Sequence, residues 1–540
     1  MKNILANFLD NNCEDSALPK DRLKFMYALI IIIFFIIISR LIFLSVFTKN
    51  KSFKLSDVVD KIDRRVTIVD RNGVLIATDI GLVSFYLNRE LVTNPQETSE
   101  IIHQIIPEIS TEKLYHKLTS TTNKAKFILV KRNITPNQQN SIKESGILGF
   151  EFNESAGRVY PHKNLFSHVV GYVDTDGNGI AGLEKQYDEY LKDPTNKPLE
   201  LTLDIRIQSI LKQQLAKGLE KYKAKSILGI VSEVKTGNIL GIVSLPDFDP
   251  NQPYSASKES LYDKATYGVY EMGSIFKLFT VAIALDKNII SKDKIYDVSQ
   301  TINSASYQIK QENYTKRYLT PEEILAKSSN VGAALIGLDV GTERLRNFLN
   351  TLGMFDRVPA NFPSLAKPLL PKIWRDINTI TISYGHGIAV TPLHVIMAVG
   401  GIANDGVLKI PRFVNGEELE DSRIISSETS KTMNLYLREV VRNGTGWRAN
   451  SLGYSVGGKT GSARLLKNGK YQEGNIMANF VGVFPMNDPH FMIYIMVESP
   501  NVPGVKENIS GGAIAAPIFA RIIESIAPIL NVVPYVERIE

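Results

Sequence analysis

An apolar run near the N-terminus places the strongest constraint on this chain. It extends from Phe25 to Phe47 and reads FMYALIIIIFFIIISRLIFLSVF. A helix of this length, rising about 1.5 Å per residue, crosses a hydrocarbon layer of roughly 30 Å. Basic residues between positions 20 and 24 favour a cytoplasmic N-terminus. We expect an uncleaved anchor, within which Arg40 either extends to the outer interface or contacts a partner helix.

The remaining composition is that of a globular protein with two or three domains. The chain has 540 residues, of which 44% are hydrophobic and 22% charged. The net charge of +6 comes without a dense basic run, so we expect no nucleic-acid partner. Because Cys13 is the single cysteine, no internal disulfide can form, and packing of the core must hold the fold.

Patterning divides the chain into a cytoplasmic tail at 1–24, the anchor at 25–47 and two further segments. Segment 50–200 has short strand-like runs, a hairpin turn at Asn72-Gly73 and no catalytic cluster, so we interpret it as a structural or docking module. Segment 201–530 begins with a helix that Asp204 caps, followed by strands, a helical middle, further strands and a closing helix. This order predicts a single α/β sandwich.

The first candidate for chemistry is Ser274-x-x-Lys277, at the mouth of a strongly apolar helix. A spacing of three residues keeps both side chains on one helix face, within reach of each other. A serine hydroxyl needs a base to become nucleophilic, and burial disfavours the charged form of a lysine. Serine followed by lysine at this spacing recurs elsewhere in the chain, for example at Ser255, so the motif taken alone favours an ordinary helix cap with a surface lysine.

The second candidate is Ser328-Ser329-Asn330, ahead of an apolar helix expected to begin near Val331. Ser328 is placed to relay a proton between Lys277 and a leaving amine, and Asn330 to bind a substrate amide. Plain helix capping is the alternative, because serine and asparagine often cap helices.

The tripeptide Lys-Thr-Gly occurs twice. At Lys235 it lies between two apolar runs and predicts a hairpin turn. At Lys459 it follows two glycines, in the sequence GGKTGS, which leaves a strand edge free for a substrate peptide. Lys459 would supply charge for a carboxylate and Thr460 a hydroxyl, and the backbone N–H groups of Ser274 and Ser462 would stabilise an oxyanion.

Taken together, a helix-borne Ser-x-x-Lys, a Ser-x-Asn and a strand-borne Lys-Thr-Gly follow the order found in penicillin-recognising serine enzymes. The chain resembles class B penicillin-binding proteins of the division-specific type over nearly its whole length. Further stretches that carry the resemblance are TIVDRNGVLIAT, LTLDIRIQ, TGNILGIVSLPDFDPN, ISYGHGIAVTPLH and NGTGWRA. The stretch around Arg158 and Glu184 resembles the non-catalytic pedestal of that family.

The resemblance implies a fold and a reaction. The fold is a transpeptidase sandwich of the serine β-lactamase-like type, with an α+β pedestal and one N-terminal transmembrane helix. The reaction is D,D-transpeptidation of peptidoglycan stem peptides ending in D-Ala-D-Ala. Ser274 would be the acylated nucleophile, Lys277 its base, Ser328 and Asn330 the second motif, and Lys459, Thr460 and Gly461 the third. β-Lactams would trap the same serine.

The resemblance also implies a setting: the inner membrane of a bacterium, with the catalytic domain in the periplasm and a polytopic glycosyltransferase as partner. Work at the division septum is the leading interpretation. Side-wall elongation, a catalytically idle division scaffold, and a β-lactamase or D,D-carboxypeptidase are the alternatives. Two positions depart from the family pattern: Met272 stands where proline is common, and Val66 follows Arg65 where glycine is common.

Histidine and metal chemistry receive no support from the sequence. Neither His386 nor His394 is needed if lysine is the base, although a supporting role for His386 beside the site stays open. No metal-ligand spacing is present, and no cofactor is implied.

Overall fold

The computed structural model describes residues 28–40, 65–120, 125–299, 301–304, 307–309, 316–467, 470–501 and 509–534. Residues 28–40 form a helix in which every residue is exposed, and the remainder of the predicted anchor lies outside the described residues. Of the helices in the described ranges, none combines the length and apolar content needed to cross a membrane. This N-terminal part forms a unit separate from residues 63–540.

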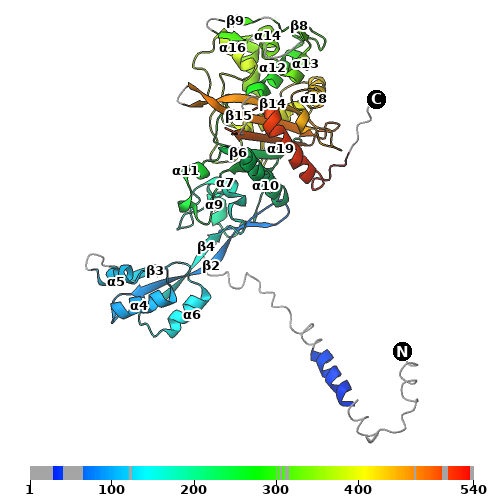
Figure 1. The fold of residues 1–540 in the computed structure, drawn as a ribbon. Coiled ribbons are helices and arrows are strands. Elements are labelled where there is room, and N and C mark those ends of the chain that lie inside the picture. Colours follow the sequence, from blue (N-terminus) through cyan, green and yellow to red (C-terminus); the bar gives the residue numbers. More distant parts are fainter. Residues whose placement is uncertain are drawn as a thin grey trace, which may run out of the picture. The chain divides into compact units, whose positions relative to one another are not determined.

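The segment after residue 65 is built on a five-stranded sheet, shown in blue and cyan in Figure 1. The predicted hairpin is confirmed: β1 and β2 pair antiparallel, and Gly73 in the turn has a φ of 80°. Three helices cover the β2–β3 part and enclose a small apolar cluster of their own. The elements are β1 (Ile68–Val69), β2 (Leu75–Asn88), β3 (Phe127–Lys131), β4 (Phe150–Val159), β5 (Leu199–Glu200), α4 (Pro95–Ile105), α5 (Thr111–Thr119) and α6 (Pro136–Glu144).

A buried ionic cluster ties three distant parts of this segment together. Glu184, in helix α8 (Gly182–Gln186), is fully buried and accepts hydrogen bonds from two arginines. Its Oε2 lies 2.8 Å from a guanidinium nitrogen of Arg65, and its Oε1 lies 2.6 Å from Nε of Arg158. Asp79 on β2 gives Arg158 a second carboxylate at 3.1 Å. Removing one partner from such a cluster leaves a buried charge uncompensated, so the three segments hold together as a group.

Val66, one of the two departures from the family pattern, fits into this arrangement. Its side chain is 7% exposed and belongs to the main apolar cluster. Its N–H donates to the carbonyl of Leu191 at 2.7 Å. The valine therefore adds core contacts and leaves the neighbouring Arg65 free to reach Glu184.

The larger part of the chain forms an α/β sandwich around a second five-stranded sheet, as expected. The strand order is β14-β15-β16-β6-β7, every neighbouring pair is antiparallel, and β14 lies at one edge. The strands are β6 (Ser226–Glu233), β7 (Ile239–Leu245), β14 (Gly457–Lys467), β15 (Lys470–Phe484) and β16 (Phe491–Glu498). Because β6 and β7 are joined through Lys235 to Asn238, the first Lys-Thr-Gly is the predicted hairpin turn.

One face of this sheet is covered by helices α10 (Ile205–Lys221) and α19 (Gly511–Ile526), which Figure 1 draws in green and red. The predicted cap of α10 is confirmed, since the Asp204 side chain accepts a hydrogen bond from the backbone N–H of Arg206. Ile207, Leu211 and Leu215 share the buried stripe of this helix. Burial of such an apolar stripe against a sheet supplies most of the stability of a helix in a folded protein.

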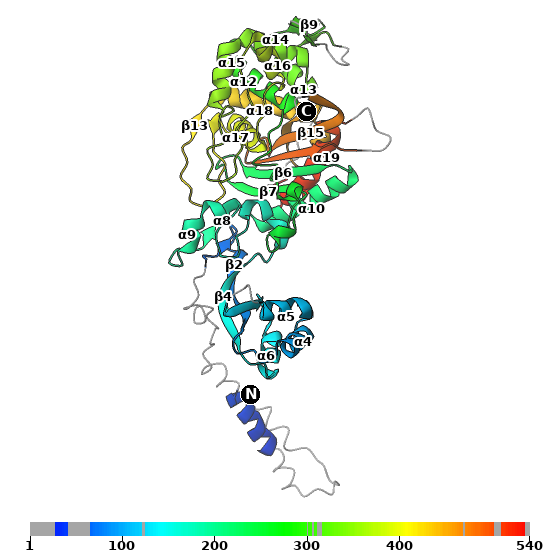
Figure 2. The same ribbon diagram turned by 90° about the vertical axis from the view of Figure 1, so that its left-hand side faces the viewer.

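The other face of the sheet carries the helical middle of the chain (Figures 1 and 2). Its strongly apolar helices form one continuous core with the side chains of β15 and β16 that point the same way. Three of these helices, α12 (Lys277–Asp286), α14 (Asn330–Val340) and α17 (Pro392–Ala403), are largely apolar and largely buried, as expected for core helices. Helices α13 (Pro321–Lys327) and α18 (Ser427–Arg442) carry polar residues on one side and bury the other.

Candidate active site

Ser274 lies in a short 3₁₀ turn, η3 (Gly273–Phe276), which runs directly into α12. Lys277, the first residue of α12, is fully buried and its Nζ lies 2.9 Å from Ser274 Oγ. The spacing of three residues places the two side chains on one face, as the sequence predicted. The serine is therefore in direct hydrogen-bond contact with a lysine amine inside the protein.

The second motif meets this pair from the neighbouring helices. Lys277 Nζ donates to the carbonyl oxygen of Ser328 at 2.6 Å and to Oδ1 of Asn330 at 2.7 Å, and it lies 3.1 Å from Ser328 Oγ. The apolar helix α14 begins at Asn330, one residue before the expected Val331, and its cap is the side chain of Ser329. Ser329 therefore performs the capping that served as the alternative explanation for this motif, which leaves Ser328 and Asn330 for the lysine.

Ser328 has a strained backbone, with φ 59° and ψ 41°. Residues other than glycine seldom adopt this left-handed conformation, and they tend to do so at functional sites. Here it ends α13 and turns both the carbonyl and the hydroxyl of Ser328 toward Lys277.

The third motif closes the group from β14. Lys459 is fully buried, and its Nζ donates to Ser328 Oγ at 3.0 Å. Burial lowers the pKa of Lys459 to about 7. The hydroxyl of Thr460 lies 2.8 Å from that of Thr445, which precedes the motif in the chain. By contrast, Lys235 of the other copy is exposed and pairs with Asp488 at 2.7 Å.

Glycines let the serine turn approach β14 closely. A Cβ on Gly273 would lie 2.5 Å from the carbonyl oxygen of Ser462, and a Cβ on Gly385 would lie 1.8 Å from the carbonyl oxygen of Gly273. A Cβ on Gly461 would lie 1.9 Å from Oδ1 of Asn479 and 2.5 Å from the carbonyl oxygen of Met272. Carbon atoms do not approach oxygen so closely, so the turn fits against the strand only because these side chains are absent.

Ser462 contacts two neighbouring elements, one through its side chain and one through its backbone. Its Oγ accepts a hydrogen bond from the N–H of Gly511 at 3.0 Å, which ties β14 to the start of α19. Its backbone carbonyl is the first atom that a Cβ added at Gly273, beside Ser274, would meet. The residue therefore links the strand to the serine turn on one side and to α19 on the other.

The two histidines differ in their surroundings. His394, in α17, bonds to Thr391 Oγ1 at 2.7 Å and to the carbonyl oxygen of Asp356 at 2.8 Å, which is the expected structural role. His386 packs against Tyr384, and its buried Nδ1 has no hydrogen-bond partner. Burial lowers the pKa of His386 to about 4. It is therefore neutral near pH 7.

Several residues of this region escaped the sequence analysis. The carbonyl of Gly385 accepts a hydrogen bond from the N–H of Gly273 at 3.2 Å. Thr445 contacts Thr460 of the third motif, and Asn479 lies beside Gly461 of the same motif. The glycine-rich SYGHG stretch was the one signal available for Gly385, whereas isolated threonine and asparagine residues give none. In the described ranges, no three His, Cys, Asp or Glu side chains gather into a group suited to a metal ion.

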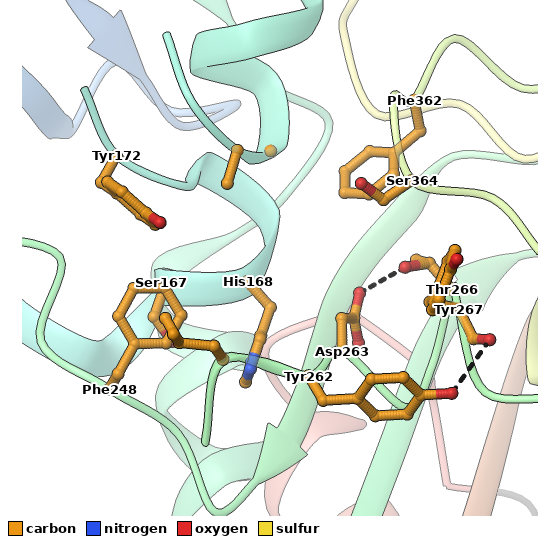
Figure 3. A pocket seen from close by; sticks show the side chains of 13 residues that line it. Ser167, His168, Tyr172, Phe248, Tyr262, Asp263, Thr266, Tyr267, Phe362 and Ser364 are labelled. Atoms are coloured by element: carbon orange, nitrogen blue, oxygen red, sulfur yellow. Dashed lines mark hydrogen bonds between the residues drawn. The ribbon is translucent and has the colours of Figure 1, made fainter. Parts of the chain in front are cut away.

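A separate hollow of about 210 Å³ lies away from these residues. Figure 3 shows it between His168 and Tyr172 on one side and Tyr262, Asp263 and Phe362 on the other. None of the predicted site residues lines it.

We predict that Gly461→Ala lowers the free energy of unfolding by about 1–3 kcal/mol, because the new methyl group overlaps the Asn479 amide and the Met272 carbonyl. In an Asn479→Ala background the same change should cost measurably less, since half of the obstacle is gone. Urea denaturation of the four proteins in this double-mutant cycle measures the difference. Strictly additive effects of the two substitutions would contradict the packing described.

The chain matches two family models in adjacent stretches. Residues 227–524 match the penicillin-binding protein transpeptidase domain, and residues 63–197 match the penicillin-binding protein dimerisation domain. Together they include the ionic cluster, all three motifs and nearly all of both sheets, with strand β5 in neither range.

Named relatives agree with the family models. The chain is 31% identical to the "probable peptidoglycan D,D-transpeptidase FtsI" of Caulobacter vibrioides, over 87% of this chain and 82% of that protein. It is 29% identical to the "probable peptidoglycan D,D-transpeptidase PenA" of Neisseria meningitidis, over 95% and 93%. A crystal structure of a peptidoglycan synthetase from Bifidobacterium adolescentis shares the fold with a TM-score of 0.70 at 20% identity, over 89% of this chain and 97% of that one. The chain therefore belongs to the family of penicillin-binding proteins that carry a transpeptidase domain and a dimerisation domain.

Proposed function

We propose that this chain is a peptidoglycan D,D-transpeptidase that acts through an acyl-enzyme on Ser274. The observation that carries the proposal is the environment of Lys277 Nζ. Two of its neighbours, the Ser328 carbonyl and Asn330 Oδ1, can only accept hydrogen bonds, and they lie closest, at 2.6 and 2.7 Å. An uncharged amine that donates its two hydrogens to them keeps its lone pair for the hydroxyl proton of Ser274, 2.9 Å away. The amine then serves as general base.

The reaction follows from this arrangement. Ser274 Oγ attacks the carbonyl of the penultimate D-Ala as its proton passes to Lys277, and the C–N bond to the terminal D-Ala breaks. Ser328 Oγ, placed 3.1 Å from Lys277 Nζ and 3.0 Å from Lys459 Nζ, relays this proton from Lys277 to the leaving amine. An amine of a neighbouring stem peptide then attacks the ester. Its proton passes to Lys277 and on to Ser274 Oγ as the ester C–O bond breaks, which releases Ser274 and forms the cross-link. With a β-lactam, the reaction stops once the ester with Ser274 has formed.

Strand β14 is the proposed docking edge for the donor peptide. It is the edge strand of its sheet, so its outer backbone groups are open to an added strand. Gly461 adds no side chain that would obstruct this edge. Lys459 and Thr460 are the proposed partners of the terminal carboxylate. The backbone N–H groups of Ser274 and Ser462 are the proposed donors to the tetrahedral oxyanion.

Treatment of the full-length protein with benzylpenicillin should add one covalent adduct on the peptide that contains Ser274, as mass spectrometry of a digest reads out. Ser274→Ala should abolish the adduct, whereas Ser255→Ala, at another serine that precedes a lysine by three residues, should leave it intact. An adduct that persists in Ser274→Ala would refute the assignment. Rapid loss of the adduct from the wild-type protein would instead indicate a hydrolase.

We expect kcat/KM for acylation by benzylpenicillin to fall as the pH rises above about 7. The free enzyme loses the ammonium of Lys459 there, because burial lowers its pKa to about 7, and a neutral amine attracts the carboxylate of the antibiotic less. Rapid-quench labelling over a range of pH values measures this falling limb. A penicillin methyl ester, which lacks the carboxylate, is the control and should not show it. The same limb with both compounds would argue against the role of Lys459.

The organisation of the chain is part of the proposal: a tail at 1–24, an anchor at 25–47, a pedestal at 50–200 and a transpeptidase domain at 201–530. Support for the anchor comes from the helix at 28–40, whose apolar side chains are all exposed and so need an apolar surrounding. The full-length protein should stay in the membrane fraction after an alkaline carbonate wash, as immunoblotting would show. Release into the wash would contradict a spanning anchor and the proposed periplasmic placement.

We propose that the enzyme works at the division septum, in contact with a polytopic glycosyltransferase. The relative named FtsI aligns with most of this chain, which supports the division role. Depletion in the native host should produce filaments, scored by microscopy. Round cells would favour the side-wall alternative. Rescue of division by the Ser274→Ala protein would instead indicate a scaffold without catalytic duty.

A further inference from the structure

Asn479 is a buried polar residue to which no role has been assigned so far. It lies on β15, directly opposite Gly461 of the third motif, and its side chain is fully buried. Neither Oδ1 nor Nδ2 has a hydrogen-bond partner. Burying an amide without partners is costly, so a native structure that contains one calls for a reason.

The surroundings of this amide include a backbone acceptor. The position that a Cβ of Gly461 would take lies 1.9 Å from Asn479 Oδ1 and 2.5 Å from the carbonyl oxygen of Met272. The amide therefore lies beside that carbonyl, in the space that Gly461 leaves open. Two oxygens that only accept repel each other there. A half-turn of the amide keeps its shape, exchanges Oδ1 for Nδ2, and puts an N–H donor toward the Met272 carbonyl.

Met272 immediately precedes the serine turn and is held on its other sides already. Its sulfur accepts a hydrogen bond from the hydroxyl of the buried Tyr494 at 3.2 Å. The N–H of Gly273 donates to the carbonyl of Gly385 at 3.2 Å. As the N-cap residue of η3, Met272 also directs its carbonyl into the first hydrogen bond of the 3₁₀ turn. A carbonyl oxygen has two lone pairs, so a second donor can bind it and fix the direction of the chain into Ser274.

We propose that Asn479 is a positioning residue, which donates a hydrogen bond to the Met272 carbonyl and thereby holds the Ser274 N–H in place for the oxyanion. This inference rests on the proposed acyl-enzyme function. Asn479 acts on the reaction through the turn, while Gly461 supplies the space in which its amide reaches that turn. The absence of a side chain at Gly461 is thus explained by the space that the Asn479 amide needs on the neighbouring strand.

The test compares acylation of full-length wild-type, Asn479→Leu and Asn479→Asp proteins by a fluorescent penicillin. Leucine has similar volume and no donor, so we expect acylation about tenfold slower at every pH, with a circular-dichroism spectrum like that of the wild type. A carboxyl at the same place donates while it is protonated and repels the Met272 carbonyl once it is ionised. Burial raises the pKa of such a group, so Asn479→Asp should acylate nearly normally at acidic pH and lose rate, relative to the wild type, as the pH rises.

The pH-dependent rescue separates positioning from packing, because a merely structural effect of Asn479→Asp would not follow the donor in this way. Ser232, on β6 of the same sheet, is another buried polar residue whose side chain has no hydrogen-bond partner. Ser232→Ala is therefore the control, and we expect it to leave the acylation rate unchanged. Equal rates for wild-type and Asn479→Leu proteins, or a constant ratio of Asn479→Asp to wild type across pH, would overturn the inference. A wild-type protein that takes up no penicillin would instead overturn the proposed function.

Discussion

The close approach of the serine turn to strand β14 is the contact on which the site depends. It needs Gly273 and Gly461 without side chains, because a methyl group at either would overlap a backbone or amide oxygen across the contact. Gly385 has the same effect on the other side of the turn, where a methyl group would overlap the carbonyl of Gly273. The turn brings Ser274, and the strand brings Lys459 and the backbone of Ser462. Side chains at Gly273 or Gly461 would push the turn away from the strand.

Two buried lysines share the hydroxyl of Ser328 in the candidate active site. Lys277 and Lys459 are both fully buried, and Ser328 Oγ lies within 3.1 Å of each Nζ. The hydroxyl of Ser328 therefore bridges the amine beside Ser274 and the amine of the third motif. The strained backbone of Ser328 is the conformational cost of this placement.

Local patterns predicted what depends on local geometry. The reach from Ser274 to Lys277 follows from helical spacing, and the turn at Lys235 follows from its flanking strands. The meeting of the three motifs was predicted from their order and from the family resemblance, since no local rule brings segments so distant together. Ser328 in the left-handed region and Asn479 opposite Gly461 could not be predicted, because both depend on contacts between segments far apart in the chain.

The ionic cluster of the dimerisation-type segment has a consequence for the order in which the chain can mature. Glu184 is the shared carboxylate of Arg65 and Arg158, yet it is synthesised after both. Until α8 follows, Arg65 lacks this carboxylate, and Arg158 has only that of Asp79 on β2. The shared carboxylate therefore couples burial of the two arginines on the earlier strands to the arrival of α8.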